Sequence, residues 1–428
     1  MNPLVALSYG IAGQFARFGA ALAPVTGGKV ARSLRARRGI RARYAAWGAA
    51  HRDRSRPLLW IHAPSVGEGL QAKPVIALLR ARHPALQIAY TFFSPSAEKF
   101  AAGIGADFTD YLPFDTHGDA AATLDALQPT ALVFSKLDVW PTLAAAAAAR
   151  HVPLGIISAT LAAESGRSSW LASMLLGDAY RALDSVGTID ERDGARLAAL
   201  GVRSDCVTVT GDTRYDQVWA RAQSADRSSA LLFPFADGRP TVVAGSTWPA
   251  DESVLLEAWR TVRSRIPGAR LIIAPHEPMS SHLASVERYA SSHAIRIARL
   301  GAAGEGDAEI VLVDRVGVLG DLYAVASLSY VGGGFHSAGL HSVLEPAAFG
   351  SPVLFGPRHT ASRDAGLLLA AGGGFSAHSS DELAVRLLEL LTETEARAAA
   401  GSRARAVVEQ GLGAADKSAA LVERLLGV

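Results

Sequence analysis

From residue 57 onward, short apolar runs rich in β-branched and aromatic residues alternate with longer stretches rich in Ala and Leu. Strands that are apolar on both sides are typical of a parallel sheet covered by helices on both faces. The alternation therefore predicts a doubly wound α/β architecture. The runs predicted as strands are residues 58–63, 87–93, 131–137, 153–159 and 206–211, then 241–247, 270–276, 309–314, 327–334 and 352–357.

A polar interruption divides these runs into two groups. Residues 222–230 read AQSADRSSA and are followed by prolines and a glycine, a composition typical of a linker. We expect two Rossmann-like domains facing each other across a cleft, at 46–221 and 241–428, joined by a linker at 222–240; the last helix can pack back on the first domain. Such sheets bind ligands at the carboxyl ends of their strands, so the residues after each strand are the functional candidates.

Charge is distributed unevenly along the chain. Residues 1–56 hold 11 Lys and Arg against one acid, a net charge of +10, and because the whole chain carries +2 the remainder carries −8. A general nucleic-acid-binding role is therefore not expected, because the basic excess is confined to one segment. The single cysteine, Cys206, excludes an internal disulfide and a multi-cysteine metal site, and it fits a reducing compartment.

The segment 1–45 combines an apolar stripe with this basic excess. The stripe is interrupted by Arg17 and is shorter than the roughly 20 residues of a spanning helix. Its charges follow the apolar part, whereas in a secretory signal they precede it. We expect the segment to associate with an anionic membrane surface through the arginines of 32–43, although an ordinary helix packed on the first domain is the alternative. The stripe consists of Leu4, Leu7, Ile11, Phe15, Phe18 and Leu22.

The motif HAPSVGEG, at 62–69, ends the first predicted strand. Glu68 in this motif is a candidate general base, because the adjacent glycines let a substrate hydroxyl approach the backbone closely. Ser65 and Gly67 are candidate acceptor-binding residues. A carboxylate in the first turn of a helix is also favoured by the helix dipole, so a structural role for Glu68 stays open at this point.

Two more motifs follow strands in the first half. SKLDVWP, at 135–141, contains Lys136 and Asp138, which as residues i and i+2 of a strand share a face and could form an ion pair at the cleft floor. GDTRYD, at 211–216, contains Arg214, whose guanidinium suits a carboxylate or phosphate. A purely structural pair and a solvated loop arginine are the alternatives.

The second half places polar side chains at corresponding positions. In AGSTWPADE, Ser246 and Thr247 stand between a strand and a helix expected to begin near Pro249, where hydroxyl and backbone N–H groups can hold a phosphate. APHEP offers His276 at a strand end, although a lone histidine is more often structural than catalytic.

The richest stretch is GGGFHSAGLHSVLEP, at 332–346. Bare N–H groups of a glycine run, followed by the start of a helix, are typical of an anion site. Glu345 can accept ribose hydroxyls in such a site, or it can simply close a capping box with Ser342. The candidate donor-binding residues here are Gly332, Gly333, Gly334, Gly339, His341, Ser342 and Glu345.

Missing motifs narrow the class of protein. The chain contains no P-loop, and no G-x-G-x-x-G follows the first strand, which argues against NTPases and dinucleotide-binding enzymes. It contains no Asp-x-Asp pair, which argues against metal-clamped diphosphate chemistry.

Nine motifs in order resemble those of the 3-deoxy-D-manno-octulosonic acid (Kdo) transferases, which have the GT-B fold, and they cover about residues 57–370. The N-terminal segment is also similar to the membrane-associating segment of that family. The chain departs from the family pattern at Asp138, where Glu is usual, at Ser342, where Asn is usual, and in APHEP, which lacks an arginine. The motifs are HAPSVGEG, TFFSPSAE (91–98), YLPFD (111–115), SKLDVWP, GDTRYD, AGSTWPADE, APHEP, GGGFHSAGLHSVLEP and FGP (355–357).

The resemblance implies an inverting, metal-independent glycosyltransferase without a cofactor, which moves Kdo from CMP-Kdo to a lipid A precursor in lipopolysaccharide biosynthesis. It implies a location at the cytoplasmic face of the bacterial inner membrane, peripheral or anchored by the N-terminus, with the acceptor bound by 46–221 and the CMP-sugar by 241–428. By family analogy the catalytic residues are Glu68, as general base, and Asp138; the acceptor-binding residues are Ser65, Gly67 and Lys136; and the donor-binding residues are Arg214, Ser246, Thr247, His276 and the 332–345 loop.

Two other readings stay open. A GT-B glycosyltransferase or an epimerase that uses a UDP-sugar would keep the glycine loop and Glu345. An inactive membrane-bound scaffold would keep the same fold, although retention of Glu68 and of the motifs at the strand ends argues against it.

Overall fold

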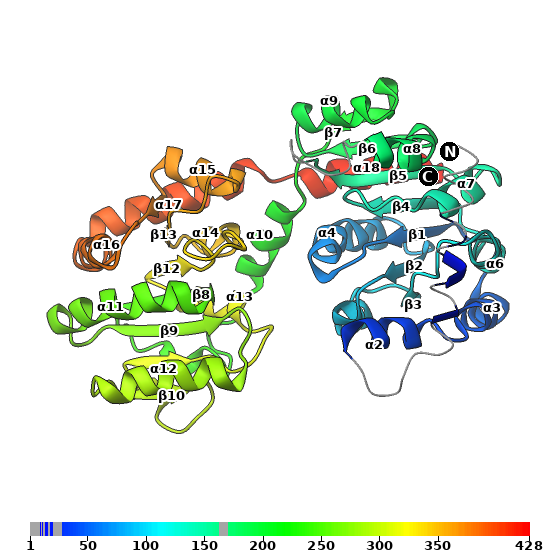
Figure 1. Ribbon diagram of the computed structural model, residues 1–428. Helices are drawn as coiled ribbons and strands as arrows, with labels where there is room; N and C mark the ends of the chain where they lie inside the picture. Colours follow the sequence, from blue (N-terminus) through cyan, green and yellow to red (C-terminus); the bar gives the residue numbers. More distant parts are fainter. Residues whose placement is uncertain (1–8, 10, 12, 16–17, 20–27, 162–169) are drawn as a thin grey trace. The chain divides into compact units, whose positions relative to one another are not determined.

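The computed structural model describes residues 9, 11, 13–15, 18–19, 28–161 and 170–428 (Figure 1). The chain divides into two compact units: unit 1 is Met1–Gln217 with Leu412–Val428, and unit 2 is Val218–Gly411. The division falls inside helix α10 (Arg214–Ser224), so the segment 222–240 follows it within unit 2.

Unit 1 is built on a seven-stranded sheet in the order β3-β2-β1-β4-β5-β6-β7, and every strand pair is parallel. The central strands are buried along their whole length, as expected for a sheet covered on both faces. The sequence pattern predicts five of these strands and misses β3 and β6. The strands are β1 Leu58–His62, β2 Gln87–Phe92, β3 Phe108–Tyr111, β4 Ala131–Ser135, β5 Leu154–Ala159, β6 Ser185–Thr188 and β7 Val207–Val209.

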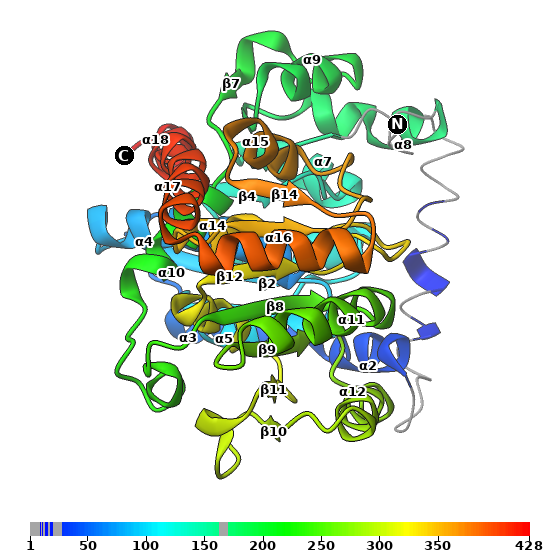
Figure 2. The ribbon, with the colours of Figure 1, turned by 90° about the vertical axis from the view of Figure 1, so that its left-hand side faces the viewer.

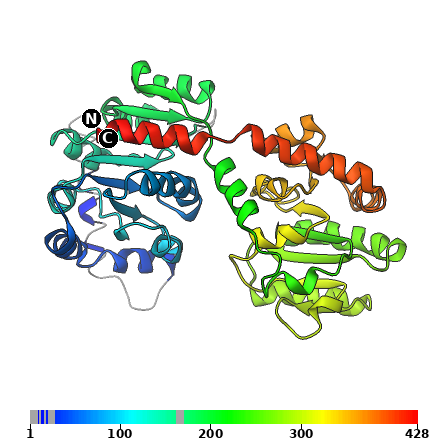
Figure 3. The ribbon, with the colours of Figure 1, turned by 180° about the vertical axis from the view of Figure 1, so that it is seen from behind.

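The last helix of the chain, α18 (Ala414–Leu426), belongs to unit 1, where it packs on α4 and on strands β4, β5 and β6 (Figure 3). The carboxylate of Asp216 accepts the backbone N–H groups of Gly413 at 2.8 Å and of Ala415 at 2.9 Å, and so caps this helix. The other helices are α2 Lys29–Ala36, α3 Ile40–His51, α4 Val66–Arg82, α5 Glu98–Ala102, α6 His117–Leu127, α7 Pro141–Ala148, α8 Trp170–Arg181 and α9 Glu191–Ala199.

Unit 2 repeats this architecture with a second parallel sheet of seven strands, in the order β10-β11-β9-β8-β12-β13-β14 (Figure 2). Its strands are β8 Thr241–Thr247, β9 Arg270–Pro275, β10 Ile297–Arg299, β11 Ile310–Leu312, β12 Leu328–Val331, β13 Val353–Phe355 and β14 Gly374–Ser376. Its helices are α11 Pro249–Arg265, α12 Ser280–Ser292, α13 Leu319–Leu322, α14 Leu344–Ala348, α15 Arg363–Ala371, α16 Ser380–Thr392 and α17 Thr394–Gln410.

Two Rossmann-like units of seven parallel strands confirm the predicted fold class. The strand order reverses once beside the first strand of each sheet: β1 pairs with both β2 and β4, and β8 pairs with both β9 and β12. Ligands of doubly wound sheets bind at the carboxyl ends of the strands at this switch point. The ends of β1 and β4 in unit 1, and of β8 and β12 in unit 2, are therefore the places to look for function.

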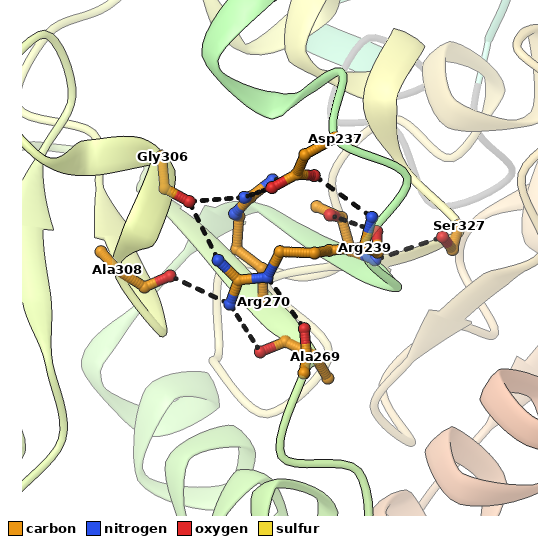
Figure 4. Close-up of polar contacts among 9 residues, drawn as sticks. Asp237, Arg239, Ala269, Arg270, Gly306, Ala308 and Ser327 are labelled. Carbon is orange, nitrogen blue, oxygen red and sulfur yellow. Dashed lines mark hydrogen bonds and ion pairs between the residues drawn. The ribbon is translucent and has the colours of Figure 1, made fainter.

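At the opposite end of the unit 2 sheet, where its strands begin, a buried arginine binds the chain that precedes β8 (Figure 4). Arg270 begins β9 and is fully buried; it forms an ion pair with Asp237 and donates to the backbone oxygen of Gly306 at 2.7 Å. Arg239 donates to that same oxygen at 2.9 Å. These contacts fix the chain around Asp237 to the sheet of unit 2, although its composition predicts a linker.

Candidate active site

Glu68 lies just after β1, in the first turn of α4, with polar partners around its carboxylate. Ser65, the N-cap residue of α4, donates its hydroxyl to Oε2 of Glu68, and Nζ of Lys136 lies 3.5 Å from Oε1. The side chain of Glu68 is 18% exposed and that of Lys136 is 43% exposed, so a ligand can reach both. The structure thus brings Glu68, Ser65 and Lys136 together, with the exposed Gly67 beside them.

The position of Lys136 follows from the way β4 ends. The strand stops at Ser135, and Lys136 has a φ of +68°, an uncommon conformation for a residue with a side chain. The Ser135 hydroxyl donates to the backbone oxygen of Glu68 at 2.9 Å and ties this turn to α4. The strand spacing expected for Lys136 and Asp138 is therefore wrong, because both lie beyond the strand. Lys136 contacts Glu68, and Asp138 is half-buried in the turn.

The fully buried ring of His62 connects three of the sequence motifs. Its Nδ1 lies 3.0 Å from the hydroxyl and 3.1 Å from the backbone oxygen of Thr91, and its Nε2 accepts the indole N–H of Trp140 at 3.2 Å. Burial lowers the pKa of His62 to about 3, so the ring is neutral at physiological pH. With Nε2 as acceptor, the proton is on Nδ1 and is donated to Thr91.

Arg214 lies in unit 1, whereas the other predicted donor-binding residues lie in unit 2. Its Nε and Nη2 donate to Oδ2 of Asp212 at 2.8 and 2.6 Å. The neighbouring Thr213 donates its hydroxyl to the backbone oxygen of Gln71 at 2.8 Å, one turn after Glu68 on α4. The GDTRYD motif therefore belongs to the same strand-end region as Glu68, and the side chain of Arg214, 39% exposed, remains accessible there.

In unit 2, the glycine run after β12 is required by close packing. A Cβ at Gly332 would overlap the backbone oxygen of Ser246, and one at Gly334 would overlap the backbone nitrogen of Gly356. Gly333 has a φ of +93°, and a Cβ there would overlap the backbone oxygen of Gly339. A side chain at Gly332 or Gly334 would displace the end of β8 or β13, and one at Gly333 would displace the loop at Gly339.

The carboxylate of Asp251 occupies the N–H groups that were expected to bind an anion. Oδ2 of Asp251 accepts from the backbone of Gly333 at 2.8 Å and of Trp248 at 3.0 Å, and Oδ1 accepts from the backbone of Phe335 at 3.0 Å. The N–H of Gly332 is used as well, because it donates to Gly245 at 2.9 Å. The expectation of bare N–H groups is therefore wrong for Gly332 and Gly333, and the carboxylate that accepts from Gly333 belongs to the fully buried Asp251.

Ser246 and Thr247 differ in what they can offer a ligand. The Thr247 side chain is fully buried and donates its hydroxyl to Glu252 at 2.7 Å, and Glu252 lies 2.8 Å from the ring of His282. Ser246 is half-buried and has a φ of +54°. Of the two predicted hydroxyls, only that of Ser246 is placed to meet a ligand, and Thr247 supports the loop from within.

Three histidines surround the indole of Trp248 at the strand ends of unit 2. His336 stacks on Trp248 with ring centroids 4.3 Å apart and planes 8° apart, and His276 stacks on His341 with centroids 4.3 Å apart. The indole N–H of Trp248 donates to Nε2 of His341 at 3.0 Å. Burial lowers the pKa of His341, and electrostatic repulsion between its protonated form and His276 acts in the same direction. No group of three or more His, Cys, Asp or Glu in the described part of the chain is arranged to hold a metal ion.

Glu345 is half-buried at the start of the short helix α14. Burial raises the pKa of its carboxyl, and the charge of Arg221 acts in the opposite direction. The capping-box alternative is wrong, because Val343 is the N-cap residue and the exposed Ser342 lies before it. Gly339, with a φ of +85°, forms the turn between His336 and His341.

Trp248, His336 and Asp251 are the site residues that sequence reasoning missed. The first and third stand in the AGSTWPADE motif, where Asp251 looks like an ordinary first-turn acid. His336 stands in the glycine-rich stretch, four residues after the first glycine. The aromatic rings of Trp248 and His336 lie within motifs that were selected because they follow strands, so the sequence did indicate where to find these two residues.

The N-terminal segment is described only in part. Ile11, Phe15 and Phe18 of the predicted apolar stripe are 48%, 72% and 66% exposed, and the remaining members, Leu4, Leu7 and Leu22, lie outside the described residues. Among the described helices, none has the length and the apolar composition needed to cross a membrane.

Several arginines of 32–43 are engaged within unit 1. Arg37 is buried among three aromatic rings, and other arginines form ion pairs with acidic side chains of the first domain. This pairing reduces the charge that the segment can present to an anionic surface. The pairs are Arg32–Glu98 at 2.6 Å, Arg43–Asp110 at 2.6 Å and Arg41–Asp119.

Solved structures share the fold of most of the chain. The UDP-GlcNAc 2-epimerase of Neisseria meningitidis has a TM-score of 0.63 at 17% identity, and covers 87% of this chain and 100% of its own. The UDP-GlcNAc 2-epimerase of Methanocaldococcus jannaschii has a TM-score of 0.55 at 13% identity, and covers 83% of this chain and 100% of its own. At 17% and 13% identity these similarities show that the fold is GT-B-like, and they do not indicate the activity.

Sequence comparison identifies the family. Residues 34–217 match the family model described as 3-deoxy-D-manno-octulosonic-acid transferase (kdotransferase). The 3-deoxy-D-manno-octulosonic acid transferase of Bordetella pertussis is 30% identical over 383 residues, which are 86% of this chain and 87% of that one. That of Haemophilus influenzae is 26% identical over 362 residues, covering 83% and 84%.

The fold and these relatives together define a glycosyltransferase with two Rossmann-like units. Within that class, the chain belongs to the family of 3-deoxy-D-manno-octulosonic acid (Kdo) transferases.

Proposed function

We propose that this chain transfers Kdo from CMP-Kdo to a lipid A precursor in lipopolysaccharide biosynthesis, with inversion at the anomeric carbon and without a metal. One observation carries the proposal: in a chain of this family, the Glu68 carboxylate is held between the Ser65 hydroxyl and the Lys136 ammonium at the switch point of unit 1. A carboxylate with this exposure can receive the proton of a substrate alcohol.

The reaction is a single displacement. Glu68 takes the proton from an acceptor hydroxyl, and the oxygen forms a bond to the anomeric carbon of Kdo. The bond from that carbon to the phosphate oxygen breaks, and its electron pair leaves with CMP. Lys136 and Asp138 lie in the turn after β4 and orient the acceptor beside Glu68.

The donor is assigned to unit 2. Glu345 accepts a ribose hydroxyl, and Ser246, His276 and His341 contact the phosphate. CMP carries one phosphate, so it does not offer the paired phosphates that a metal chelates in nucleoside diphosphate sugars. Arg214 and Lys136 supply positive charge for the carboxylate of Kdo.

We also propose that the enzyme works at the cytoplasmic face of the inner membrane. The exposed Ile11, Phe15 and Phe18 support this location, since amphipathic segments bind membranes through such side chains. Replacing both phenylalanines by Ser is expected to lower co-sedimentation with anionic vesicles. Unchanged co-sedimentation would make the segment an ordinary packed helix.

Mass spectrometry of the product formed from CMP-Kdo and a lipid A precursor tests the reaction. Protection from thermal unfolding tests the nucleotide, because only a bound ligand raises stability. We expect CMP to protect the protein and UDP to protect it much less, with the protection by CMP reduced in Glu345→Gln. Glu257→Gln, at an exposed position of unit 2, is the matched control. Stronger protection by UDP would favour the UDP-sugar reading, and protection without any product would favour an inactive scaffold.

A further inference from the structure

Two sequence motifs, TFFSPSAE and YLPFD, have no role in the reaction described above, yet they meet in one pocket of unit 1. The pocket has a volume of about 490 Å³. Pockets of roughly 300 to 1,000 Å³ are typical of small-molecule sites. Six of its lining residues come from these two motifs, from SKLDVWP, and from helix α2 with its C-cap residue Arg37. They are Val30, Leu34, Arg37, Phe93, Phe114 and Trp140.

The lining offers an occupant few free polar groups. The carboxylate of Asp115, on one wall, accepts the backbone N–H groups of Thr142 at 2.9 Å and of Leu143 at 2.8 Å, and the hydroxyl of Tyr9 at 2.9 Å. The indole N–H of Trp140 is donated to His62. A ligand that fills this space gains by burying hydrocarbon and not by forming hydrogen bonds.

Arg37 adds a positive charge to this apolar wall. Its side chain is buried, and its N–H groups donate to backbone oxygens of Leu112 at 2.8 Å, Ser33 at 2.9 Å and Phe93 at 3.2 Å. The guanidinium carbon lies 4.2 Å from the centre of the Phe93 ring. Among the described residues, no carboxylate forms an ion pair with it within 4.0 Å. The pocket therefore combines hydrocarbon walls with two buried ionisable side chains, Arg37 and Asp115.

The pocket lies at the same end of the sheet as Glu68. Phe93 directly follows β2, and Trp140 follows the turn that carries Lys136. The ring of Trp140 packs on Phe93 with centroids 5.2 Å apart, and its N–H reaches His62 at the end of β1. A molecule whose alcohol is activated by Glu68 can extend from there into the pocket.

We propose that this pocket holds an acyl chain of the lipid acceptor. The inference rests on the proposed function, which supplies a substrate with hydrocarbon chains. Each methylene group that leaves water favours binding by about fourfold, so a few buried carbons decide between an acylated acceptor and its deacylated sugar.

The test compares KM for an acylated acceptor with KM for the same acceptor after deacylation, both with CMP-Kdo. Val30→Asp places a charge at the pocket and Leu34→Trp fills it. Val30 is 74% exposed, so its replacement is compatible with folding. Val385→Asp, on α16 at 64% exposure, is the matched control. We expect the wild type to prefer the acylated acceptor, the two pocket variants to lose about tenfold or more of that preference, and the control to keep it.

A preference that is unchanged in both pocket variants would overturn the acyl-chain assignment while leaving the reaction intact. Absence of transfer to either acceptor by the wild type would overturn the proposed function, and this assignment with it. Quenching of Trp140 fluorescence by brominated acyl chains distinguishes a chain of the acceptor from a chain of a membrane phospholipid. A brominated acceptor should quench wild type more than Trp140→Phe, whereas quenching by a brominated phospholipid alone would assign the pocket to the membrane.

Discussion

At the scale of single residues, Glu68 is positioned by two partners of different kinds. Ser65 belongs to the same helix start, so the contact is local and readable from the S-x-x-E spacing. Lys136 comes from the turn after β4, the strand beside β1 in the sheet, where its backbone adopts a positive φ, and its Nζ lies 3.5 Å from Oε1 of Glu68. A sequence pattern predicts the first contact, but not the second, because no spacing rule relates residues on different strands.

Replacing Glu68 by Gln should therefore lower kcat by roughly 10²-fold or more, because the amide cannot accept the proton of the acceptor, while CMP-Kdo affinity changes little. Steady-state kinetics measures the change in kcat, and a binding measurement on the same preparation measures the affinity for CMP-Kdo. Glu98→Gln, at an exposed glutamate of unit 1 paired with Arg32, is the control and should keep wild-type kcat. Near-normal turnover of Glu68→Gln would remove this carboxylate from the mechanism.

His62 makes unit 1 sensitive to acid. Its pKa is about 3 in the folded protein and 6.5 ordinarily, so between these values the unfolded chain binds a proton that the native ring does not. The contribution of neutral His62 to the free energy of unfolding should therefore be present in full above pH 6.5. Below pH 6.5 the free energy of unfolding should fall by up to about 1.4 kcal/mol for each pH unit. Urea unfolding of the wild type and of His62→Gln at pH 7 and pH 5 measures this, with the smaller loss expected in the variant. A ring whose nuclear magnetic resonance signals titrate near pH 6.5 would contradict it.

At the scale of elements, most strands of both sheets are predictable from their apolar runs, and the four that the pattern misses are short. The missed strands β3, β6, β10 and β14 have three or four residues, and three of them form sheet edges. Edge strands bury less surface, so their sequences carry a weaker apolar signal. The sequence correctly indicates that the glycine run needs an unusual backbone conformation. It does not indicate that Asp251, on helix α11, accepts hydrogen bonds from the N–H groups of Gly333 and Phe335.

Gly333→Ala should disrupt the loop between β12 and α14. A methyl group there meets the backbone of Gly339 at an unfavourable φ, and such strain is worth about 1 to 3 kcal/mol. We expect a lower unfolding temperature for unit 2 and weaker protection by CMP. Gly366→Ala, on helix α15 with open space around it, is the matched control and should be neutral or slightly stabilising. Equal melting curves for the two variants would show that the loop tolerates a side chain.

At the scale of the whole molecule, unit 1 depends on residues from both ends of the chain. Leu421, Val422 and Leu426 of α18 are buried in its core. Composition and motifs predict two Rossmann-like units and allow the last helix to pack back on the first, where the structure has it. Its contacts with α4 and with strands β4, β5 and β6 depend on long-range packing, which a sequence pattern does not specify.

Deleting 412–428 should destabilise unit 1 by roughly 5 kcal/mol or more, because each buried Leu or Val contributes about 1.5 to 3 kcal/mol. Unit 2 should still bind CMP, which calorimetry can measure. Deleting Val428 alone, which is 51% exposed, is the control. A truncated chain that retains two unfolding transitions at wild-type temperatures would show that α18 is dispensable for the first sheet.

The placement of α18 also sets an order for folding in the cell. The strands of unit 1 are synthesised before unit 2, whereas the helix that covers β4, β5 and β6 is synthesised after it. Unit 2, whose residues are contiguous, is synthesised in full before that helix, so the second half of the polypeptide can mature first. Until that helix is made, strands β4, β5 and β6 keep an uncovered apolar face, which is prone to aggregation.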